Sequence, residues 1–253
     1  MGRAQKSNSE IIQQLPRAFF HLVSGTIAVG LFVFLFDRKS SIIAVSILTF
    51  ILVGFELSRF VFPKLNSVLM SIFSKLIRPR EKSELSGQMF YALGLFWAFV
   101  FLPKVLAVQS ILILAWMDPV AGIVGSKWGR VEWVRVFEKF WNQGLTEIEI
   151  KIVGKKTLEG SFAGFFVALG AGFVSWNILG ANLLDPVGGT GILAGWSAAS
   201  VGWLFSGVGA FVAMLAEAWP SQWDDNANVP FWVGAILWVL ALLLGVPLTW
   251  GGV

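Results

Sequence analysis

Three short charged segments interrupt a chain that is otherwise dominated by apolar residues. Residues 118–122 read Asp-Pro-Val-Ala-Gly, residues 154–161 read Gly-Lys-Lys-Thr-Leu-Glu-Gly-Ser, and residues 217–226 form an acidic, tryptophan-rich stretch. Each segment adjoins a long apolar run, where a charge is costly in a membrane and therefore usually marks a functional site. The three segments are candidates for one shared polar site.

The residue types in these segments are those that phosphoryl transfer requires. Such a reaction needs cations that bind the phosphates, carboxylates that hold a divalent ion, and backbone amides close to the phosphate oxygens. Lys155, Lys156 and Thr157 supply two ammonium groups and a hydroxyl just before an apolar run, whose helix would direct its positive N-terminal end at a bound anion. A lysine pair beside a membrane span is also a common topological anchor, so this segment by itself has two interpretations.

Three carboxylates are candidates for holding a metal ion or moving a proton. Asp118 precedes Pro119, which should break or start a helix, so Asp118 is either a functional group or a helix N-cap. Glu217 and Asp225 belong either to the site or to an aromatic belt with a solvated acidic turn. Because the chain has no cysteine and one histidine, a bound ion should be a hard, oxygen-ligated one such as Mg²⁺.

The composition indicates an integral membrane protein. Hydrophobic residues make up 56% of the 253 residues and charged residues 13%, and the mean hydropathy is +0.75. The lack of cysteine excludes disulfides, thiolate metal sites and cysteine nucleophiles. All 19 Lys and Arg residues lie at or before Lys156, a bias that the positive-inside rule explains more simply than nucleic-acid binding does. We therefore expect no nucleic-acid partner.

Seven apolar runs are long enough, alone or with flanking residues, to cross a bilayer as helices. The predicted fold is an all-α polytopic transmembrane helical bundle of about seven spans. The runs are 18–36, 41–55, 86–102, 105–117, 160–179, 191–218 and 231–250. The second and fourth runs are short, so we expect the second to continue past Glu56 and Arg59 and the fourth past Asp118.

The distribution of Lys and Arg among the connecting segments orients the bundle. The N-terminal tail, residues 1–17, and two connectors, residues 60–84 and 129–156, carry most of the positive charge. We therefore expect the N-terminus to be cytoplasmic and the C-terminus to lie on the other side. Helical apolar spacing in residues 64–76 predicts either an interfacial amphipathic helix or a helix lying on its neighbours. Residues 1–253 are predicted to form a single membrane domain with all three charged segments at its cytoplasmic face.

Four further polar residues lie in or next to the first two apolar runs. Arg17 and His21 are four residues apart and so share a helix face, as do Glu56 and Arg59, which are three apart. A lone histidine near a membrane interface is more often structural than catalytic. Glu56 and Arg59 can pair with each other, although their depth in the membrane favours a function. We assign these four residues to the lipid substrate or to structure.

The order of these residues resembles the CTP-dependent lipid alcohol kinases, the family that includes dolichol kinase, phytol kinase and the yeast-type diacylglycerol kinase. The resemblance extends over most of the chain. It rests on Arg17, His21, Glu56, Arg59, Asp118-Pro119 with Ala121 and the following glycines, residues 156–161, Glu217, Asp225, Asn226 and Pro230. The chain departs from the family pattern at Arg17-Ala18, where the family often has a basic pair.

The resemblance implies an enzyme that transfers the γ-phosphoryl group of CTP to the hydroxyl of a lipid alcohol in the bilayer, with Mg²⁺ or another divalent cation as cofactor. By this resemblance Lys155 and Lys156 bind the triphosphate, while Asp118, Glu217 and Asp225 are metal ligands or catalytic groups. The further nucleotide-binding residues would be Thr157, Glu159, Gly160, Ser161, Gly125 and Asn226. The membrane would be the inner membrane of a prokaryote, or the endoplasmic reticulum or plastid membrane of a eukaryote.

Two other functions are compatible with parts of the pattern. Phosphatidate cytidylyltransferases also use CTP and carry an element similar to residues 155–160, but they have a denser late motif with more Asp and Arg. An ion-coupled transporter would use Asp118 and Glu217 as intramembrane ion sites, but it predicts two related halves, which the asymmetric charge distribution opposes. The sequence leaves open which lipid alcohol is used, whether dolichol, a shorter polyprenol, phytol or diacylglycerol, and the oligomeric state.

Overall fold

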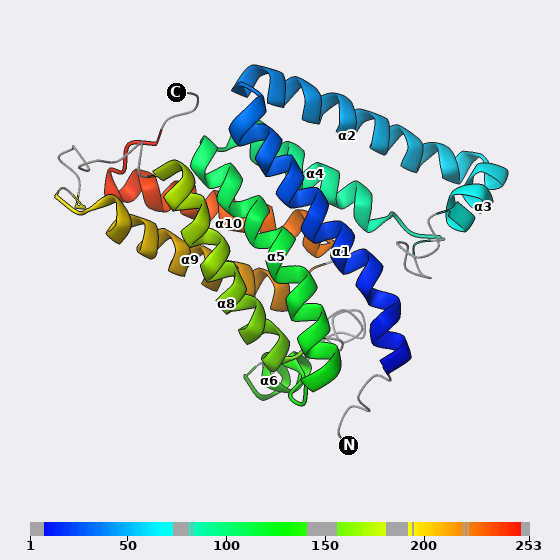
Figure 1. The fold of residues 1–253 in the computed structure, drawn as a ribbon. Coiled ribbons are helices and arrows are strands. Elements are labelled where there is room, and N and C mark those ends of the chain that lie inside the picture. Colours follow the sequence, from blue (N-terminus) through cyan, green and yellow to red (C-terminus); the bar gives the residue numbers. More distant parts are fainter. Residues whose placement is uncertain are drawn as a thin grey trace.

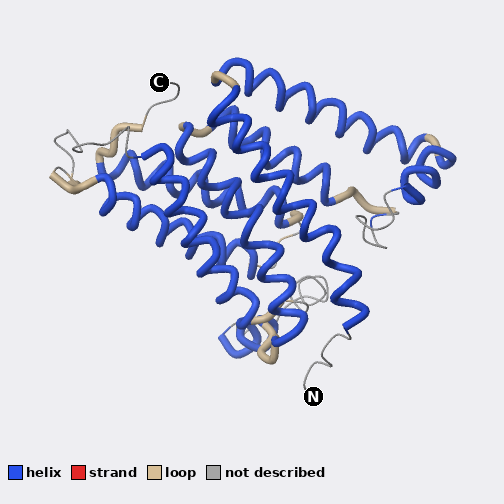
Figure 2. Tube along the Cα trace, in the orientation of Figure 1, coloured by secondary structure: helices blue, strands red, loops and turns tan. Residues whose placement is uncertain are grey.

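The described residues of the computed structural model are helical and form a bundle (Figure 1, Figure 2). The structure describes residues 8–72, 81, 83–140, 156–180, 192–193, 195–219, 221 and 223–248. The α-helices are α1 Asn8–Gly30, α2 Arg38–Val61, α3 Pro63–Ile72, α4 Gly87–Phe101, α5 Lys104–Trp128, α6 Trp133–Phe140, α8 Leu158–Ser175, α9 Ala198–Ala218 and α10 Asp225–Leu244. Short π-helical turns, Leu31–Leu35 and Trp176–Gly180, continue α1 and α8.

The all-α membrane fold predicted from the sequence is confirmed. Six of the described segments are long and apolar enough to cross a membrane: Gln14–Leu35, Arg38–Val61, Lys104–Trp128, Leu158–Leu179, Ala198–Ala218 and Asp225–Leu244. The remaining predicted span, 86–102, forms α4, a shorter apolar helix of 15 residues. Each of the seven predicted runs therefore contains one apolar helix, six of them of spanning length, and the extensions expected past Glu56 and Asp118 are both present.

Short polar side chains mark where these helices begin. Asp37 accepts a hydrogen bond from the Ser40 amide at 2.8 Å and starts α2. Ser86, Thr157, Ser197 and Asp224 cap α4, α8, α9 and α10 in the same way. Such caps satisfy backbone amides that have no partner within the helix. The sequence thus sets each helix start next to an apolar run.

The centre of the bundle is α5. Of its most apolar window, 67% is buried, against 22% in α2, so α5 is enclosed by protein while α2 faces the surroundings along most of its length. Helices α1, α8 and α10 pack on α5, and α2 packs mainly on α4 (Figure 1). A polar residue on α5 is therefore held by neighbours on several sides.

The prediction that Pro119 breaks or starts a helix is wrong, because α5 continues through it to Trp128. Proline removes one backbone hydrogen bond, here the one that residue 119 would donate to the carbonyl of Ala115. Transmembrane helices tolerate such a loss where neighbouring protein encloses the proline, and Pro119 is buried here. Asp118 is consequently a residue of the helix interior and not an N-cap.

Consecutive long helices run in alternating directions through the bundle (Figure 1). The starts of α4, α8 and α10 therefore lie at the same end as the ends of α2, α5 and α9. We call this the charged end, because it holds Asp118, Lys156, Glu217 and Asp225. The helical spacing of residues 64–76 is realised as α3, which also lies at this end and contacts α2; whether it binds the membrane interface stays a prediction.

Candidate active site

An ion pair joins two helix starts at the charged end. The Lys156 ammonium, just before α8, donates a hydrogen bond to Asp225 Oδ1, in the first turn of α10, at 2.8 Å. It also donates to the backbone carbonyl of Glu217, at the end of α9. The Lys156 side chain is 13% exposed and that of Asp225 is 25% exposed, so a ligand that carries phosphates can reach both groups.

The backbone around Lys156 is fixed by a short pairing with the segment that follows α5. The Trp133 amide donates to the Lys156 carbonyl at 3.1 Å, and the Leu158 amide donates to the Val131 carbonyl at 2.9 Å. Thr157 caps α8 by accepting from the Gly160 amide at 3.3 Å. Two of the first α8 amides are thus engaged within the protein, and Lys156 offers the main positive charge of the described site.

Two neighbouring carboxylates control the charge state of Lys156. Burial alone would lower the pKa of Lys156, but the carboxylates of Asp225 and Glu217 outweigh burial and raise that pKa above its ordinary value. Lys156 therefore remains an ammonium group throughout the neutral range.

A chain of hydrogen bonds orients the Glu217 carboxylate. Glu217 Oε2 accepts from the Ser161 hydroxyl at 2.7 Å, and Ser161 Oγ in turn accepts from the Trp133 indole at 2.9 Å. The three residues come from α9, α8 and the start of α6. Ser161, predicted as a nucleotide-binding residue, is 2% exposed, and in this structure it positions Glu217.

Asp118 faces the same group of charges from α5. Its side chain is half-buried, and it lies close enough to interact electrostatically with Lys156, Glu217 and Asp225. No hydrogen bond of Asp118 to another described residue is found. Three carboxyl groups thus interact with one ammonium group.

Other predicted nucleotide-binding residues hold this end of the bundle together. A Cβ on Gly160 would lie 2.7 Å from the Ala121 carbonyl oxygen and 3.0 Å from Gly125 Cα, so α5 and α8 touch through these two glycines. Both carboxylate oxygens of Glu159 accept from the Val131 amide at 3.3 Å. Their contacts in the structure are therefore with the protein itself.

A second polar group adjoins the first at the start of α4. Asn226, next to Asp225, is 1% exposed and donates from Nδ2 to the Gly87 carbonyl at 2.9 Å. Glu81 is also buried, and it accepts from the Gly87 amide at 3.3 Å. A Cβ on Gly87 would lie 3.4 Å from Arg17 Nη2, so the Arg17 guanidinium lies beside this turn. Asn226 thus joins α10 to the start of α4, and Arg17 of α1 lies next to the same turn.

Glu56 and Arg59 pair with each other, as their spacing allowed. Arg59 Nη2 lies 2.6 Å from Glu56 Oε1, and both side chains are buried. Glu56 also accepts hydrogen bonds from the backbone amide and, at 2.9 Å, from the hydroxyl of Ser86, the N-cap of α4. This pair connects α2 to the start of α4, which is a structural role.

His21, on α1, packs against α4. Its ring is 1% exposed and packs edge-on against Tyr91 with the centroids 4.9 Å apart. The Tyr91 hydroxyl lies directly over Gly25, where a side chain would overlap it. The structure therefore brings Asp118, Lys156, Ser161, Glu217 and Asp225 together and places Arg17 and Asn226 next to them. His21 contacts Tyr91, which interacts electrostatically with Asp118. Lys155 lies outside the described residues.

Three residues of this region were missed from the sequence. Trp133 and Glu81 lie in connectors, where no periodicity distinguishes them from their neighbours. Tyr91 carried a usable signal, because it is the only tyrosine of the chain and stands within an apolar run. A single phenol in a membrane span needs a polar neighbour or a function.

The oxygen-only donor set fits a hard divalent ion. Among the described residues, no group of three or more Asp, Glu or His side chains is arranged to hold a metal by itself. Mg²⁺ does not require such a group, because proteins commonly bind it through one or two carboxylates together with phosphate oxygens of the substrate. Asp225 and Glu217 can supply those carboxylates.

Comparison with known proteins identifies relatives over most of the chain. The CTP-dependent diacylglycerol kinase 1 of Schizosaccharomyces pombe is 26% identical over 235 residues, which cover 90% of this chain and 93% of the relative. The proteins of the same name from Saccharomyces cerevisiae and Eremothecium gossypii are 26% and 27% identical, cover 86% of this chain, and are matched over 70% and 64% of their own lengths. No protein-family model and no solved structure matches the chain. The relatives confirm the resemblance to the CTP-dependent lipid kinase family that the sequence predicted.

Proposed function

We propose that this protein is a CTP-dependent lipid kinase that transfers the γ-phosphoryl group of CTP to the hydroxyl of diacylglycerol or a related lipid alcohol, at the charged end of the bundle. The observation that carries the proposal is the Lys156–Asp225 ion pair, with Glu217 and Asp118 beside it. It combines a fixed cation with surplus carboxylates at a membrane-helix end. The names of the relatives support CTP as donor and diacylglycerol as acceptor.

Lys156 is the group that would bind the triphosphate. It is partly exposed, permanently charged, and held in place by Asp225 and the Glu217 carbonyl. A cation that is positioned before the reaction stabilises the charge that develops on the transferred phosphoryl group without reorganisation. Lys155, the residue before Lys156, is proposed to contact the same phosphates.

The surplus of carboxylates has a use once a nucleotide binds. A divalent cation such as Mg²⁺, held by Asp225 and Glu217 together with phosphate oxygens, would neutralise the charge on the transferred group. Ser161 keeps the Glu217 carboxylate turned toward this space, because its hydroxyl donates to Oε2.

Asp118 is proposed as the base that receives the proton of the lipid hydroxyl. Asp225 is paired with Lys156, and Glu217 accepts from Ser161, whereas Asp118 has no hydrogen-bond partner among the described residues. In the reaction, the lipid oxygen bonds to the γ-phosphorus, the bond between the β- and γ-phosphates breaks, CDP leaves, and the hydroxyl proton passes to Asp118.

The charged end is proposed to face the cytoplasm, where CTP is made. The positive connectors 60–84 and 129–156 begin and end at this end of the bundle, in agreement with the positive-inside rule. The N-terminus would then be cytoplasmic as well.

The test is transfer of label from γ-labelled CTP to lipid by the purified protein, with diacylglycerol and polyprenols offered in separate reactions. Replacement of Lys156 by Met keeps the length of the side chain and removes its charge, and it should lower kcat about 10²–10³-fold. Lys104→Met is the matched control, because Lys104 lies at the opposite end of the bundle, over the Phe32 ring.

Wild-type protein and Lys104→Met should form labelled lipid phosphate at equal rates. If the wild-type protein labels no lipid alcohol at all, the kinase proposal is wrong. If Lys156→Met and Lys104→Met have the same activity, transfer occurs but the site has been misplaced.

A further inference from the structure

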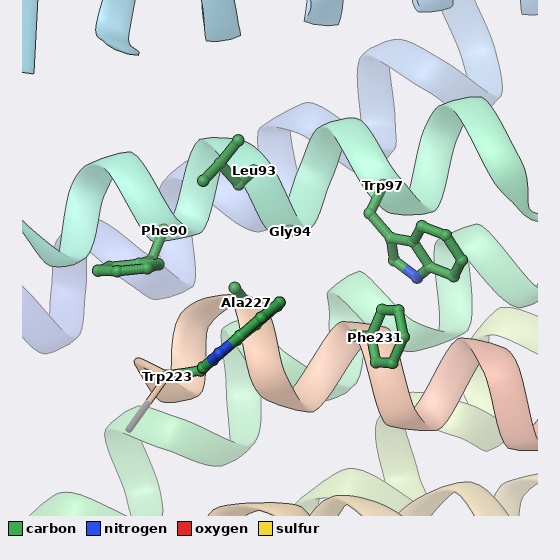
Figure 3. Close-up of a pocket in the computed structure, with 7 residues that line it drawn as sticks. All are labelled: Phe90, Leu93, Gly94, Trp97, Trp223, Ala227 and Phe231. Atoms are coloured by element: carbon green, nitrogen blue, oxygen red, sulfur yellow. The ribbon is translucent and has the colours of Figure 1, made fainter. Parts of the chain in front are cut away.

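An apolar groove lies between α4 and α10, next to the charged end (Figure 3). It has a volume of about 570 Å³, within the range of about 300–1,000 Å³ that is usual for small-molecule pockets. Helix α4 contributes Phe90, Leu93, Gly94 and Trp97. The opposite wall is formed by Trp223, Ala227 and Phe231. No charged side chain lines it.

The two helices touch at Gly94, which is itself one of the lining residues. A Cβ on Gly94 would overlap the backbone carbonyl of Asn226, so α4 and α10 touch at this point. One end of the groove is closed by Trp97 and Phe231, whose ring centroids lie 4.8 Å apart (Figure 3). The other end lies between Phe90 and Trp223, and Trp223 is 63% exposed. The groove therefore opens toward the starts of α4 and α10.

This opening lies at the same level as the ion pair. Ala227, in the wall of the groove, is two residues from Asp225 and within the same first turn of α10. From Phe90 to Trp97 the groove extends over seven residues of α4, about 10 Å at 1.5 Å per residue. A molecule that fills it would thus have its apolar part along α4 and α10 and its polar end at the start of α10, at the level of Asp225.

We propose that this groove binds the hydrocarbon tail of the lipid alcohol and so positions its hydroxyl for phosphorylation. The inference rests on the proposed function for the identity of the head group. The occupant is a single tail, because the walls are apolar and one end is closed by aromatic rings. A groove of about 10 Å is shorter than half of a hydrocarbon core of ~30 Å. It therefore contacts the part of the tail nearest the hydroxyl, and the rest of the tail stays in the bilayer.

The first test fills or opens the groove and measures kinetics. Leu93→Trp fills it and Phe231→Ala opens it, whereas Trp232→Ala changes the exposed neighbour of Phe231 and serves as the control. Leu93→Trp should raise the KM for a long-chain diacylglycerol about tenfold and leave the KM for CTP unchanged. It should have much less effect on a diacylglycerol whose acyl chains are too short to reach Trp97.

The second test does not depend on catalysis. A diacylglycerol with a photoreactive diazirine in its acyl chain should label α4 and residues 223–244 of the wild-type protein, and Leu93→Trp should reduce this labelling about tenfold while Trp232→Ala leaves it intact. If transfer fails for every lipid alcohol while the groove is still labelled, the kinase proposal falls and the lipid site stands.

Three results would overturn the groove proposal. One is labelling spread equally over lipid-facing helices such as α2, which would show bulk lipid only. Another is an equal KM increase for long-chain and short-chain substrates in Leu93→Trp. The last is cross-linking of the groove residues to a second copy of the chain, which would show that a protein surface covers the groove.

Discussion

Helix α5 carries two polar side chains, Gln109 and Asp118, that are only nine residues apart and that differ in their hydrogen bonding. Gln109 is fully buried, its Nε2 donates to the Phe205 carbonyl at 2.9 Å, and its Oε1 accepts from the Trp176 indole at 2.8 Å. Asp118 is half-buried and interacts electrostatically with Lys156, which also has Glu217 and Asp225 as neighbours. The first group is a neutral amide with both ends paired, whereas the second is an ionisable group without a hydrogen-bond partner among the described residues.

This difference indicates that Gln109 has a structural role and Asp118 a functional one, although both belong to α5. A neutral amide in a membrane interior stabilises helix packing when both of its ends are paired. An ionisable side chain in the same setting costs free energy, and proteins usually keep one there because it has a function. By this reasoning Gln109 joins α5 to α9 and to the turn after α8, while Asp118 is available to interact with a substrate.

The largest effect should follow from Asp118→Asn. This change keeps the shape of the side chain but removes the proton acceptor, and it should lower kcat about 10²–10⁴-fold. The KM for CTP should change little, since Lys156 and its partners stay in place. Steady-state rates of labelled lipid phosphate formation give both constants.

Asp37→Asn is the control for Asp118→Asn, because Asp37 caps α2 at the other end of the bundle. It should leave kcat unchanged. An Asp118→Asn protein that is folded and retains full kcat would remove Asp118 from the chemistry and weaken the contrast with Gln109.

The next effect concerns the contact between α5 and α8 beneath the site. Gly160→Ala introduces a Cβ 2.7 Å from the Ala121 carbonyl, so the helices must separate, at a cost of about 1–3 kcal/mol. Gly170→Ala, farther along α8, meets no atom within 4 Å and should stabilise the helix by about 0.5–1 kcal/mol. Thermal unfolding in detergent should move the two variants in opposite directions, and equal shifts would contradict this packing.

A smaller change in stability, with no change in chemistry, is expected for Gln109→Leu. It leaves the Trp176 indole and the Phe205 carbonyl without their partner, at a cost of about 0.6–1.7 kcal/mol. Activity per folded molecule should equal that of the wild-type protein, in contrast to Asp118→Asn. A large loss of kcat at unchanged folded fraction would show that the interior group takes part in function.

The positions of the helices could be predicted because the information for them is local. Each apolar run and its adjacent cap residue lie within one stretch of sequence, so α2 and α5 were anticipated even where polar residues continue them. Pro119 was misjudged because its tolerance depends on the tertiary packing that buries it. That packing is not visible in the residues next to Pro119.

The sequence predicted which residues gather at the charged end better than it predicted how they pair with one another. Alternating spans and positive connectors placed Asp118, Lys156, Glu217 and Asp225 at one end. The pairing of Lys156 with Asp225, 69 residues away, and the use of Glu159 and the α8 amides within the protein depend on tertiary packing. Residues 131–133, which hold the Lys156 backbone, gave no signal for the same reason.

The smallest expected effect is the pH dependence of the ion pair. The pKa of Lys156 is raised above its ordinary value of 10.5 in the folded protein, so its charge contributes stability that is fully present below pH 10.5 and is lost as the pH rises through the folded-state pKa. The difference in stability between wild-type protein and Lys156→Met should therefore be constant from about pH 7 to 10 and decrease above that. A difference that already decreases between pH 7 and 9 would contradict the assigned pairing.

In the proposed reaction, the charged end of this bundle breaks the bond between the β- and γ-phosphates of CTP. The most direct measurement is the identity and amount of the products formed from CTP and diacylglycerol by the purified protein. We predict one CDP released for each lipid phosphate formed, dependent on added lipid and absent in Lys156→Met. Release of pyrophosphate with formation of a CDP-lipid, and no CDP with any alcohol, would contradict the account and assign the site to nucleotidyl transfer.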